Sequence, residues 1–277
     1  MRPFGLILWL IACAAQPAWA QAPEAPGSLE QQLAATASDN PGEYGIAAMD
    51  LSTGASVAFH GDEAFPMAST VKIAIAATYL SQVDAGRRSL DDTTAAGQSA
   101  AKLMDLMITR SDNRATDLLL GMLGGPGAVD SWLRSNNLTG IRVDRTIAQL
   151  LGDRRDLHDV RDSSTPAAML GLLRLIDAGP SLTPSSRALL LDMMARCVTG
   201  TNRIKGILPP GARVEHKTGT LNGYTGDVGF LTTPAGKRIA LVIFARGGEN
   251  RPGVIATIAR EIYEGFTQAP VQPMGTR

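Results

Sequence analysis

The chain has 277 residues, of which 44% are hydrophobic and 19% are charged, and its 26 Lys and Arg residues balance 26 Asp and Glu residues. This composition excludes a disordered chain, which needs low hydrophobicity and high net charge. It also argues against a nucleic-acid-binding protein, because a phosphate backbone calls for a basic surplus or a dense basic stripe. The length allows one large domain or two interleaved ones.

The first twenty residues have the features of an export signal. Arg2 precedes an apolar run over residues 4–15, which is too short to span a bilayer easily, and residues 18–20 form the small-x-small pattern of a cleavage site. We therefore expect residues 1–20 to be a signal peptide and the protein to be exported, either to the periplasm or out of the cell.

A second processing route remains open at Cys13. Residues 10–13 fit a lipobox-like pattern, so the alternative is a lipoprotein anchored at Cys13. Cleavage after Ala20 would remove Cys13 and leave Cys197 as the single cysteine. An exported protein with one thiol has no internal disulfide and depends on packing for its stability.

The predicted elements follow a linker over residues 21–27, which is rich in Ala, Pro and Gly. Apolar spacing predicts a helix over 28–38, and alternating patterns predict a hairpin of strands 44–51 and 55–59. The predicted helices of the middle region cover 70–85, 98–109, 115–123, 129–136, 166–177 and 184–194. Strands are predicted again at 226–231 and 238–244, and a last helix at 254–266.

Strands from both chain ends flank this helical middle, which predicts an α+β fold with one antiparallel sheet flanked by helices and an inserted all-helical domain. We expect one domain over 28–277. Its sheet subdomain would comprise 28–64 and 197–270, and its helical subdomain 65–196. We also expect a monomer without a stable membrane span.

The first motif with chemical meaning is Ser69 followed three residues later by Lys72. Residues three apart on a helix share a face, so the Ser69 hydroxyl and the Lys72 amine can meet. Serine is a weak nucleophile until a neighbouring base takes its proton, and a helix N-terminus favours the developing alkoxide. The spacing alone is a weak signal, because Ser99 and Lys102 repeat it, and we expect that second pair to lie on the surface of an ordinary helix.

Two further motifs give the first one its meaning. A Ser-Asp-Asn sequence occupies residues 111–113, and a Lys-Thr-Gly sequence occupies 217–219 after a predicted strand over 213–216. Alone, each is an ordinary helix cap or strand end. Together and in this order, the three motifs are those of class A β-lactamases and penicillin-binding proteins. The chain resembles that superfamily over nearly all its mature length, and residues 65–72 resemble the class A active-site signature.

The resemblance implies the sandwich of helices and sheet found in β-lactamases and DD-peptidases, and a catalytic role for four matching side chains. Ser69 would be the acylated nucleophile and Lys72 its activating base or proton relay. Ser111 would pass a proton to the leaving β-lactam nitrogen. Lys217 would favour a neutral Lys72 by like-charge repulsion.

The same resemblance implies the substrate-binding residues. Asn113 would hold the amide of the substrate side chain. The Lys-Thr-Gly strand, with Thr218, Gly219 and Thr220, would bind the substrate carboxylate together with Lys217. The backbone N–H groups of Ser69 and Thr220 would form the oxyanion hole.

Two departures from the family pattern concern the rim of the site. The interval from Ser69 to Ser111 is short, so residues 86–98 lack the loop that carries an aromatic gatekeeper over the cleft. The strand position expected to hold a carboxylate-binding arginine is Gly226. Arg246 or Arg251 would substitute for it, although a surface role for both is an equal alternative.

A third departure concerns deacylation. In class A enzymes a loop closed by an Arg–Asp pair carries a glutamate that activates the deacylating water. Residues 144–145 and 161–162 resemble the ends of that loop, but the glutamate position is Ile147, and no Glu occurs between them. The loop is about two residues longer, so a shifted register could bring in a polar residue, and the candidates are Gln149, Asp153, Asp156 and Asp159. We favour a solvated loop for these aspartates, with slow hydrolysis of the acyl-enzyme.

The sequence therefore predicts a β-lactamase-type serine hydrolase that acts on a small-molecule β-lactam. The alternatives are a penicillin-binding or sensor protein that stays acylated and an enzyme that acts on a D-Ala-D-Ala-like peptide. No cofactor, metal or nucleic acid is expected, because His60, His158 and His216 are scattered and no zinc motif occurs.

Overall fold

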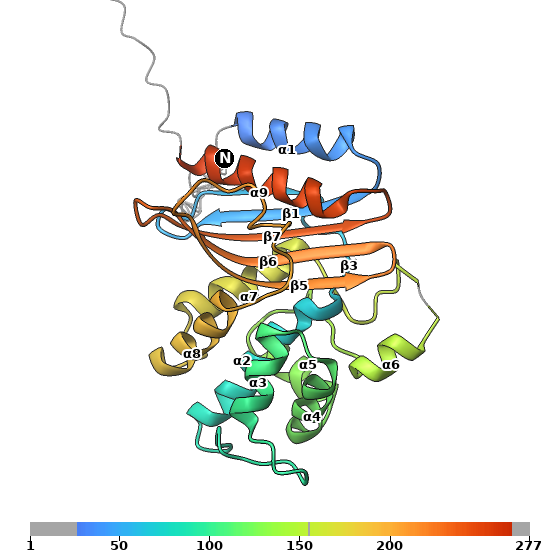
Figure 1. Ribbon diagram of the computed structural model, residues 1–277, viewed down its shortest axis with the longest axis vertical. Helices are drawn as coiled ribbons and strands as arrows, with labels where there is room; N and C mark the ends of the chain where they lie inside the picture. Colours follow the sequence, from blue (N-terminus) through green and yellow to red (C-terminus); the bar gives the residue numbers. More distant parts are fainter. Residues whose placement is uncertain (1–26, 155, 268–277) are drawn as a thin grey trace, which may run out of the picture.

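The computed structural model describes residues 27–154 and 156–267 (Figure 1). The predicted signal peptide, the lipobox at Cys13 and nearly all of the linker lie outside the described residues. Within the described part, no helix is both long and apolar enough to cross a membrane.

Five antiparallel strands form the central sheet, in the order β2-β1-β7-β6-β5. The strands are β1 (Glu43–Asp50), β2 (Ser56–Phe59), β5 (Arg213–Leu221), β6 (Tyr224–Thr232) and β7 (Arg238–Arg246). The N-terminal strand β1 pairs along its whole length with the C-terminal strand β7. This pairing confirms that both chain ends build one sheet.

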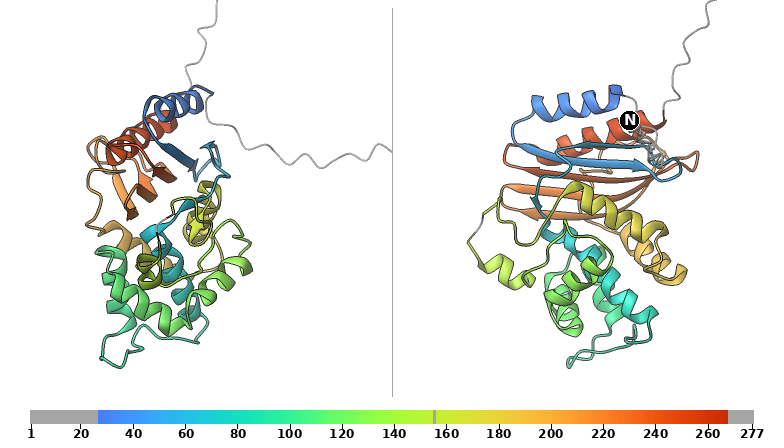
Figure 2. Two further views of the ribbon diagram at one scale, coloured as in Figure 1. Left: turned by 90° about the vertical axis from the view of Figure 1, so that its right-hand side faces the viewer. Right: turned by 180° about the vertical axis from the view of Figure 1, so that it is seen from behind.

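Helices cover both faces of this sheet (Figures 1 and 2). Helices α1 (Gly27–Asp39) and α9 (Arg251–Thr267) pack side by side on one face, where Leu33, Ile243 and Ile258 are buried. Helix α7 (Pro166–Ala178) packs on the opposite face. Because both faces are covered, β6 and β7 are buried almost throughout, which explains their nearly continuous apolar sequence.

The other helices gather beyond α7, on the side of the sheet away from α1 and α9 (Figure 2). They are α2 (Lys72–Asp84), α3 (Ala100–Thr109), α4 (Asn113–Leu123), α5 (Pro126–Ser135), α6 (Ile147–Gly152) and α8 (Pro184–Ala195). Helix α2 is central, with residues 72–80 all buried. A helix buried on every side requires apolar or small residues all round, and this segment has mostly such residues, with Lys72 as the charged exception.

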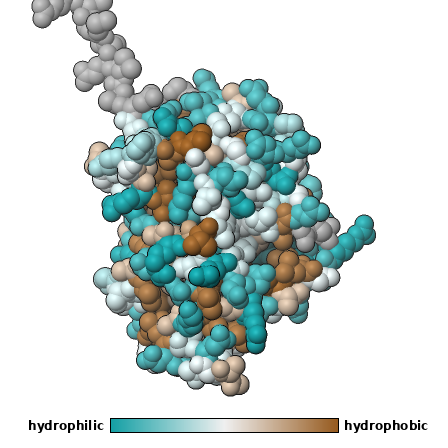
Figure 3. Space-filling model, in the orientation of Figure 1, coloured by the Kyte–Doolittle hydropathy of each residue, from teal (hydrophilic) through white to brown (hydrophobic). Residues whose placement is uncertain are grey.

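The outer surface mixes hydrophilic and hydrophobic side chains. On the face seen in Figure 3, the hydrophobic residues form several separate patches among hydrophilic ones. The large hydrophobic side chains that are exposed within the described residues are Leu151, Val160, Val198 and Ile207. Apolar side chains exposed singly are normal for a protein surface.

Capping residues set several helix boundaries. Thr183 caps α8 by accepting a hydrogen bond from Ser186 N, with Pro184 at the first helical position. Asp112 caps α4 in the same way through Ala115 N. The Ser-Asp-Asn motif therefore also forms the start of α4, and the cap holds the motif in place.

Three elements were missed by the sequence patterns. Strands β3 (Phe65–Pro66) and β4 (Ser163–Ser164) pair with each other but have two residues each, and α6 has six. Elements this short show no periodicity. The helix predicted to begin at residue 70 begins instead with a 3-10 turn, η1 (Ala68–Val71), in which Thr70 N and Oγ1 both donate to Met67 O.

Candidate active site

The turn η1 presents Ser69 at the start of α2, where the residue is partly exposed between buried neighbours. Ala68 has a φ of 47°, a left-handed conformation that is unfavourable for a residue with a side chain. Strained backbone of this kind concentrates at functional sites, because the surrounding structure must hold it. The sharp turn directs the chain from β3 into α2 immediately before the serine.

Strand β5 approaches this turn closely, and Gly219 makes the approach possible. A Cβ atom at residue 219 would lie 2.6 Å from Met67 O and 3.2 Å from Ala68 Cβ. Only glycine fits between the strand and the turn. Ser69 directly follows Ala68 on η1, and Thr220 directly follows Gly219 on β5. Because Ala68 and Gly219 approach each other closely, the backbone N–H groups of Ser69 and Thr220 can converge.

The amine of Lys72 is fully buried and has three hydrogen-bond acceptors around it. Nζ lies 2.7 Å from Ser111 O, 2.8 Å from Asn113 Oδ1 and 3.2 Å from Ser111 Oγ. An ammonium group has three donors, so these contacts account for all of them. Lys72 is therefore directed at the Ser-Asp-Asn motif, and the hydrogen bond between Lys72 and Ser69 that the spacing suggested is absent among the described residues.

Lys217 completes this arrangement from the opposite side. Its Nζ lies 2.9 Å from Ser111 Oγ and 2.9 Å from Thr218 O. Ser111 has a φ of 58°, which turns its side chain into the space between the two amines just before α4 begins. The structure thus brings the three motifs together around one hydroxyl group, from three different elements.

Burial perturbs both amines. Burial, together with the charge of Lys217, lowers the pKa of Lys72 to about 7. Burial also lowers the pKa of Lys217 to about 8. A lysine with a pKa near neutrality exists partly as a free amine, which is the form that accepts a proton.

The Lys-Thr-Gly strand carries hydroxyl groups beside these amines. Thr220 is exposed, whereas the Thr218 hydroxyl is buried and lies 2.5 Å from Thr199 Oγ1. Residue 220 pairs with Thr225 across the β5–β6 ladder. The strand therefore carries both the lysine that contacts Ser111 and an exposed threonine.

The arginine at this strand is Arg203, which no sequence pattern indicated. Its guanidinium donates to Thr220 Oγ1 at 2.7 Å and to the carbonyl oxygens of Gly219 and Gly226, each at 3.0 Å. Gly226 is the position where the family pattern places an arginine on the strand. Arg203, from the loop after α8, thus brings a guanidinium to the position where the strand itself has no arginine. No periodic pattern marks a residue in such a loop.

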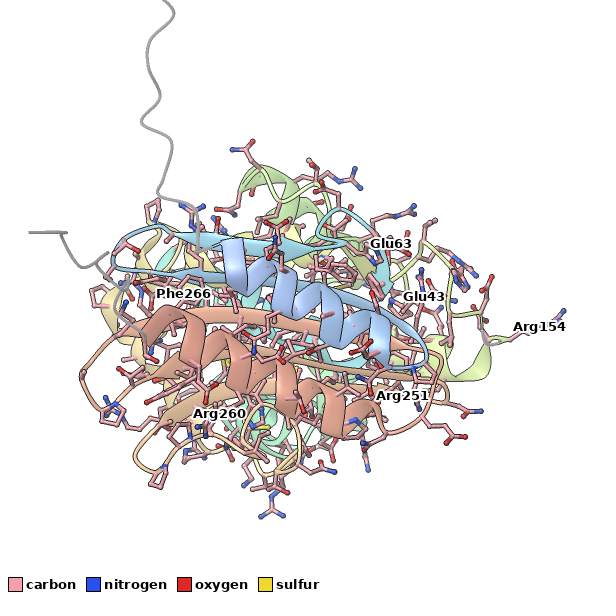
Figure 4. The ribbon with its side chains drawn as sticks, turned by 90° about the horizontal axis from the view of Figure 1, so that it is seen from above. Glu43, Glu63, Arg154, Arg251, Arg260 and Phe266 are labelled. Atoms are coloured by element: carbon pink, nitrogen blue, oxygen red, sulfur yellow. The ribbon has the colours of Figure 1, made fainter. Side chains whose placement is uncertain are left out.

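Neither of the two arginines expected at this place contacts the Lys-Thr-Gly residues. Arg246 is buried, and it pairs with Glu43 and Glu63, which lie near each other at one end of the sheet in Figure 4. Arg251 begins α9 and donates to the carbonyl oxygens of Gly247 and Gly248, and to Thr225 Oγ1 at 3.3 Å. The expectation for Arg246 is wrong, because its two carboxylate partners hold it elsewhere.

The loop between β4 and the preceding helices closes through the predicted Arg–Asp pair. Arg145 Nε lies 2.6 Å from Asp162 Oδ2, and Asp162 Oδ1 accepts hydrogen bonds from the backbone N–H groups of Asp144 and Arg145. Asp162 N donates in return to Asp144 Oδ2. Both ends of the loop are therefore tied together over 18 residues of sequence separation.

Ile147 is the first residue of α6 inside this loop, and it is 5% exposed. The carboxylate of Asp117 on α4 accepts hydrogen bonds from Ile147 N at 2.7 Å and from Ala148 N at 2.9 Å. This contact fixes α6 against α4. The side chain at the position expected for the family's glutamate is therefore apolar and can neither accept nor donate a proton.

The other polar residues of the loop have structural partners or face solvent. Gln149 completes a capping box with Thr146. Asp153 and Asp159 pair with Arg145 and Arg161. Asp156 is exposed and accepts a hydrogen bond from His158 N. Hydrogen bonds from Arg161 and the charge of Arg145 lower the pKa of Asp159 to about 2, against a smaller effect of burial, so this group is a weak base.

A small cavity of about 20 Å³ separates the loop from Ala68, next to the serine. Asp156 and Asp159 are among its lining residues, with Arg145 and Leu221. A cavity of this size holds roughly one water molecule. Among the lining carboxylates, Asp159 and Asp162 pair with arginines, whereas Asp156 has no arginine partner among the described residues.

The repeated Ser/Lys spacing proves to be an ordinary helix start. Ser99 is the N-cap of α3 and accepts a hydrogen bond from Lys102 N, and the side chain of Lys102 is exposed. The loop from residue 85 to residue 99 contains no aromatic side chain. Among the described residues, no group of three or more His, Cys, Asp and Glu side chains is arranged to hold a metal ion.

The fold and the buried Lys–Ser–Lys cluster define a serine hydrolase of the class A β-lactamase type. The sequence model of the beta-lactamase enzyme family matches residues 28–266, and the chain belongs to this family. It is 30% identical over 252 residues to the carbapenem-hydrolyzing beta-lactamase KPC of Klebsiella oxytoca, covering 82% of this chain and 85% of that protein. It is 28% identical to the extended-spectrum beta-lactamase PER-1 of Pseudomonas aeruginosa, covering 73% and 75%.

Solved structures agree with this assignment. A class A beta-lactamase representing the last common ancestor of Gram-negative bacteria is 35% identical and superposes with a TM-score of 0.81, covering 86% of this chain and 99% of its own. A beta-lactamase from Chitinophaga pinensis is 27% identical with a TM-score of 0.80 and covers 86% and 99%. The predicted α+β class and the predicted family are confirmed.

Proposed function

We propose that the protein is acylated at Ser69 by β-lactams and hydrolyses the ring amide slowly. The observation that carries this proposal is the position of Ser111 Oγ between Lys72 Nζ and Lys217 Nζ, at 3.2 and 2.9 Å, beside the turn that bears Ser69. Two perturbed amines around one hydroxyl form a path along which a proton can move from the nucleophile to a leaving group.

Acylation follows from this path. The neutral amine of Lys72 takes the proton of Ser69, and Ser69 Oγ attacks the carbonyl carbon of the β-lactam ring. The bond between that carbon and the ring nitrogen then breaks. Ser111 gives its proton to the nitrogen and recovers one from Lys72, so no proton is gained or lost overall. The pKa of about 7 for Lys72 supports the first transfer.

Binding groups surround this path on β5. The backbone N–H groups of Ser69 and Thr220 would hold the developing oxyanion, and removal of one such donor costs about 2.7–4 kcal/mol in known enzymes. Lys217, Thr220 and Arg203 present donors for the substrate carboxylate, with the guanidinium 2.7 Å from Thr220 Oγ1. Asn113 at the start of α4 would bind the amide of the substrate side chain.

Deacylation is the weak step in this proposal. Ile147 has no proton-accepting group, and the carboxylates of Asp153 and Asp159 are paired with arginines. General-base assistance contributes roughly 10²–10⁴-fold to such a step. The acyl-enzyme would therefore persist far longer than in an enzyme with a placed glutamate. The chain would be exported and act as a monomer in the periplasm or outside the cell.

A fluorescent penicillin tests the nucleophile. The parent protein should be labelled covalently, and Ser69→Ala should abolish the label. Ser99→Ala is the matched control, because Ser99 has the same spacing to a lysine, and it should be labelled like the parent. Persistent labelling of Ser69→Ala would overturn the assignment.

Intact mass spectrometry after a single penicillin pulse separates the alternative functions. A slow hydrolase loses its adduct over minutes to hours and releases ring-opened penicillin repeatedly. A sensor retains the adduct without turnover. Release of D-Ala from a D-Ala-D-Ala peptide, with a stable penicillin adduct, would instead identify a peptidase.

A further inference from the structure

Three titratable side chains lie behind the Lys-Thr-Gly strand, and the reaction described above uses none of them. They are Cys197, His216 and Asp227, with exposed fractions of 4%, 0% and 0%. Cys197 follows α8, and the other two side chains lie on the adjacent strands β5 and β6. His216 and Thr218 flank Lys217 in the sequence and so lie on the same face of β5.

The first link in this cluster joins Asp227 to His216. The two carboxylate oxygens lie 2.8 and 2.9 Å from His216 Nδ1, so this ring nitrogen donates the hydrogen bond. His216 Nε2 is buried and has no hydrogen-bond partner among the described residues, so it is free to accept a proton. The Cys197 thiol is the neighbouring group that interacts with the ring.

The second link reaches from Cys197 into the site. Its Sγ lies 3.3 Å from Thr199 Oγ1, which in turn lies 2.5 Å from Thr218 Oγ1. The carbonyl oxygen of Thr218 accepts a hydrogen bond from Lys217 Nζ. Each hydroxyl has one proton to donate. If Sγ is an acceptor, Thr199 donates to it, and Thr218 must donate to Thr199.

Charges on this cluster act on Lys217. Burial lowers the pKa of Lys217, whereas negative charge on Cys197 and Asp227 raises it. The resulting pKa of Lys217 is about 8. Burial would raise the pKa of Cys197, but the neighbouring His216 and the hydrogen bond with Thr199 lower it to about 6. Burial would lower the pKa of His216, but Asp227 raises it to about 9. At neutral pH these directions favour a thiolate beside an imidazolium.

We propose that Cys197, His216 and Asp227 form a buried ionic relay in which the Cys197 thiolate is a positioning group that keeps Lys217 protonated and orients the Thr218 hydroxyl. The proton of the thiol moves from Sγ to His216 Nε2, so the relay gains and loses no proton. The proposal rests on the proposed function, since Lys217 acts there as the cation that binds the substrate carboxylate. The other charged side chains that face Cys197 or Lys217 are the cations Lys72, Arg203 and Lys205.

Ultraviolet titration of the thiolate tests the ionic state without any reaction. The difference in absorbance between the parent and Cys197→Ser should show a thiolate at about pH 7.5 that is lost as the pH falls through about 6. His216→Gln should move this titration to a higher pH. A thiolate that appears only at the pH of an ordinary cysteine would overturn the proposal, and this measurement does not depend on acylation.

The pH profile of penicillin acylation tests the effect on Lys217. Cys197→Ala removes the anion, so the alkaline limb of the profile should move to lower pH by about one unit. Cys197→Asp restores a negative charge and should return the limb toward its parental position. A purely structural role would reduce the rate without moving the limb, and an unmoved limb in Cys197→Ala contradicts the proposal. Absence of acylation in the parent would contradict the proposed function instead.

Discussion

Lys72 and Lys217 share the hydroxyl group of Ser111, with their Nζ atoms 3.2 and 2.9 Å from the same oxygen. Two ammonium groups this close in a buried site repel each other, and each is also separated from water. The arrangement is tolerated because one amine can lose its proton near neutral pH. The same feature that makes the site unfavourable for folding gives Lys72 the low pKa that its proposed role as a base requires.

The first prediction concerns the pH dependence of acylation. Lys72 must be neutral, which requires a pH above about 7, and Lys217 must be charged, which requires a pH below about 8. The second-order rate of penicillin acylation should therefore follow a narrow bell with its maximum between these values. Stopped-flow measurement of the labelling rate from about pH 5 to about pH 10 checks this. The two apparent constants belong to the coupled pair. A rate that stays constant down to the acid end of this range would exclude Lys72 as the base.

The second prediction concerns stability. The pKa of Lys72 is about 7 in the folded protein, against an ordinary value of 10.5 in the unfolded chain, so between these values the unfolded chain binds more protons. Stability therefore rises with pH across this window, by up to about 1.4 kcal/mol per unit from this one group. Lys72→Met should remove that slope, and its advantage over the parent should be largest below about pH 7.

Urea unfolding at about pH 6, 7.5 and 9 measures this slope. Lys102→Met is the matched control, because Lys102 has the same spacing from a serine but is exposed. Its slope should equal that of the parent. Equal slopes for all three proteins would mean that Lys72 keeps its proton on folding.

The third prediction concerns the contact between β5 and η1. Gly219→Ala would place a Cβ atom 2.6 Å from Met67 O, which forces the strand away from the turn. The two backbone N–H groups of the oxyanion hole would separate, and a misplacement of about 1 Å can cost roughly 10²-fold in rate. Acylation should fall by about this factor while circular dichroism remains unchanged. Gly121→Ala on α4 is the control, since a Cβ there meets nothing within 4 Å, and a similar loss in both variants would contradict the prediction.

The fourth prediction concerns the missing base. Ile147→Glu should place a carboxylate near the deacylating water and accelerate decay of the adduct by up to ~10²–10⁴-fold. The gain corresponds to roughly 3–5.5 kcal/mol of barrier. The longer loop could reduce it, because the carboxylate must lie within hydrogen-bond reach of the water. Adduct decay after one penicillin pulse, followed by intact mass, is the measurement.

Asp153→Asn and Asp156→Asn accompany this experiment. Each should clear its adduct at the parental rate, since Asp153 is paired with Arg145 and Asp156 is exposed. Rapid clearance by the parent, stopped by either substitution, would show that a substitute base exists and that deacylation is not slow.

The sequence alone determined the class of the fold and singled out the candidate catalytic groups. Apolar periodicity is a local property, so it located most helices and the strands at both chain ends. The three motifs are short and ordered, and they marked Ser69, Lys72, Ser111 and Lys217 as one set. The repeat at Ser99 and Lys102 could be set aside because the other two motifs form a set with Ser69 and Lys72.

Only the tertiary structure decided how these groups meet and which others join them. It directed Lys72 to Ser111 and Asn113, because all three of its donors find acceptors there. It showed that Arg203, and not Arg246, contacts the Lys-Thr-Gly strand. Nothing in the sequence indicated this contact, because loops that meet in space leave no pattern in the sequence. It also brought Cys197 behind the active-site strand. Such contacts join residues far apart in the chain, and their strength depends on burial and distance, which composition and spacing do not contain.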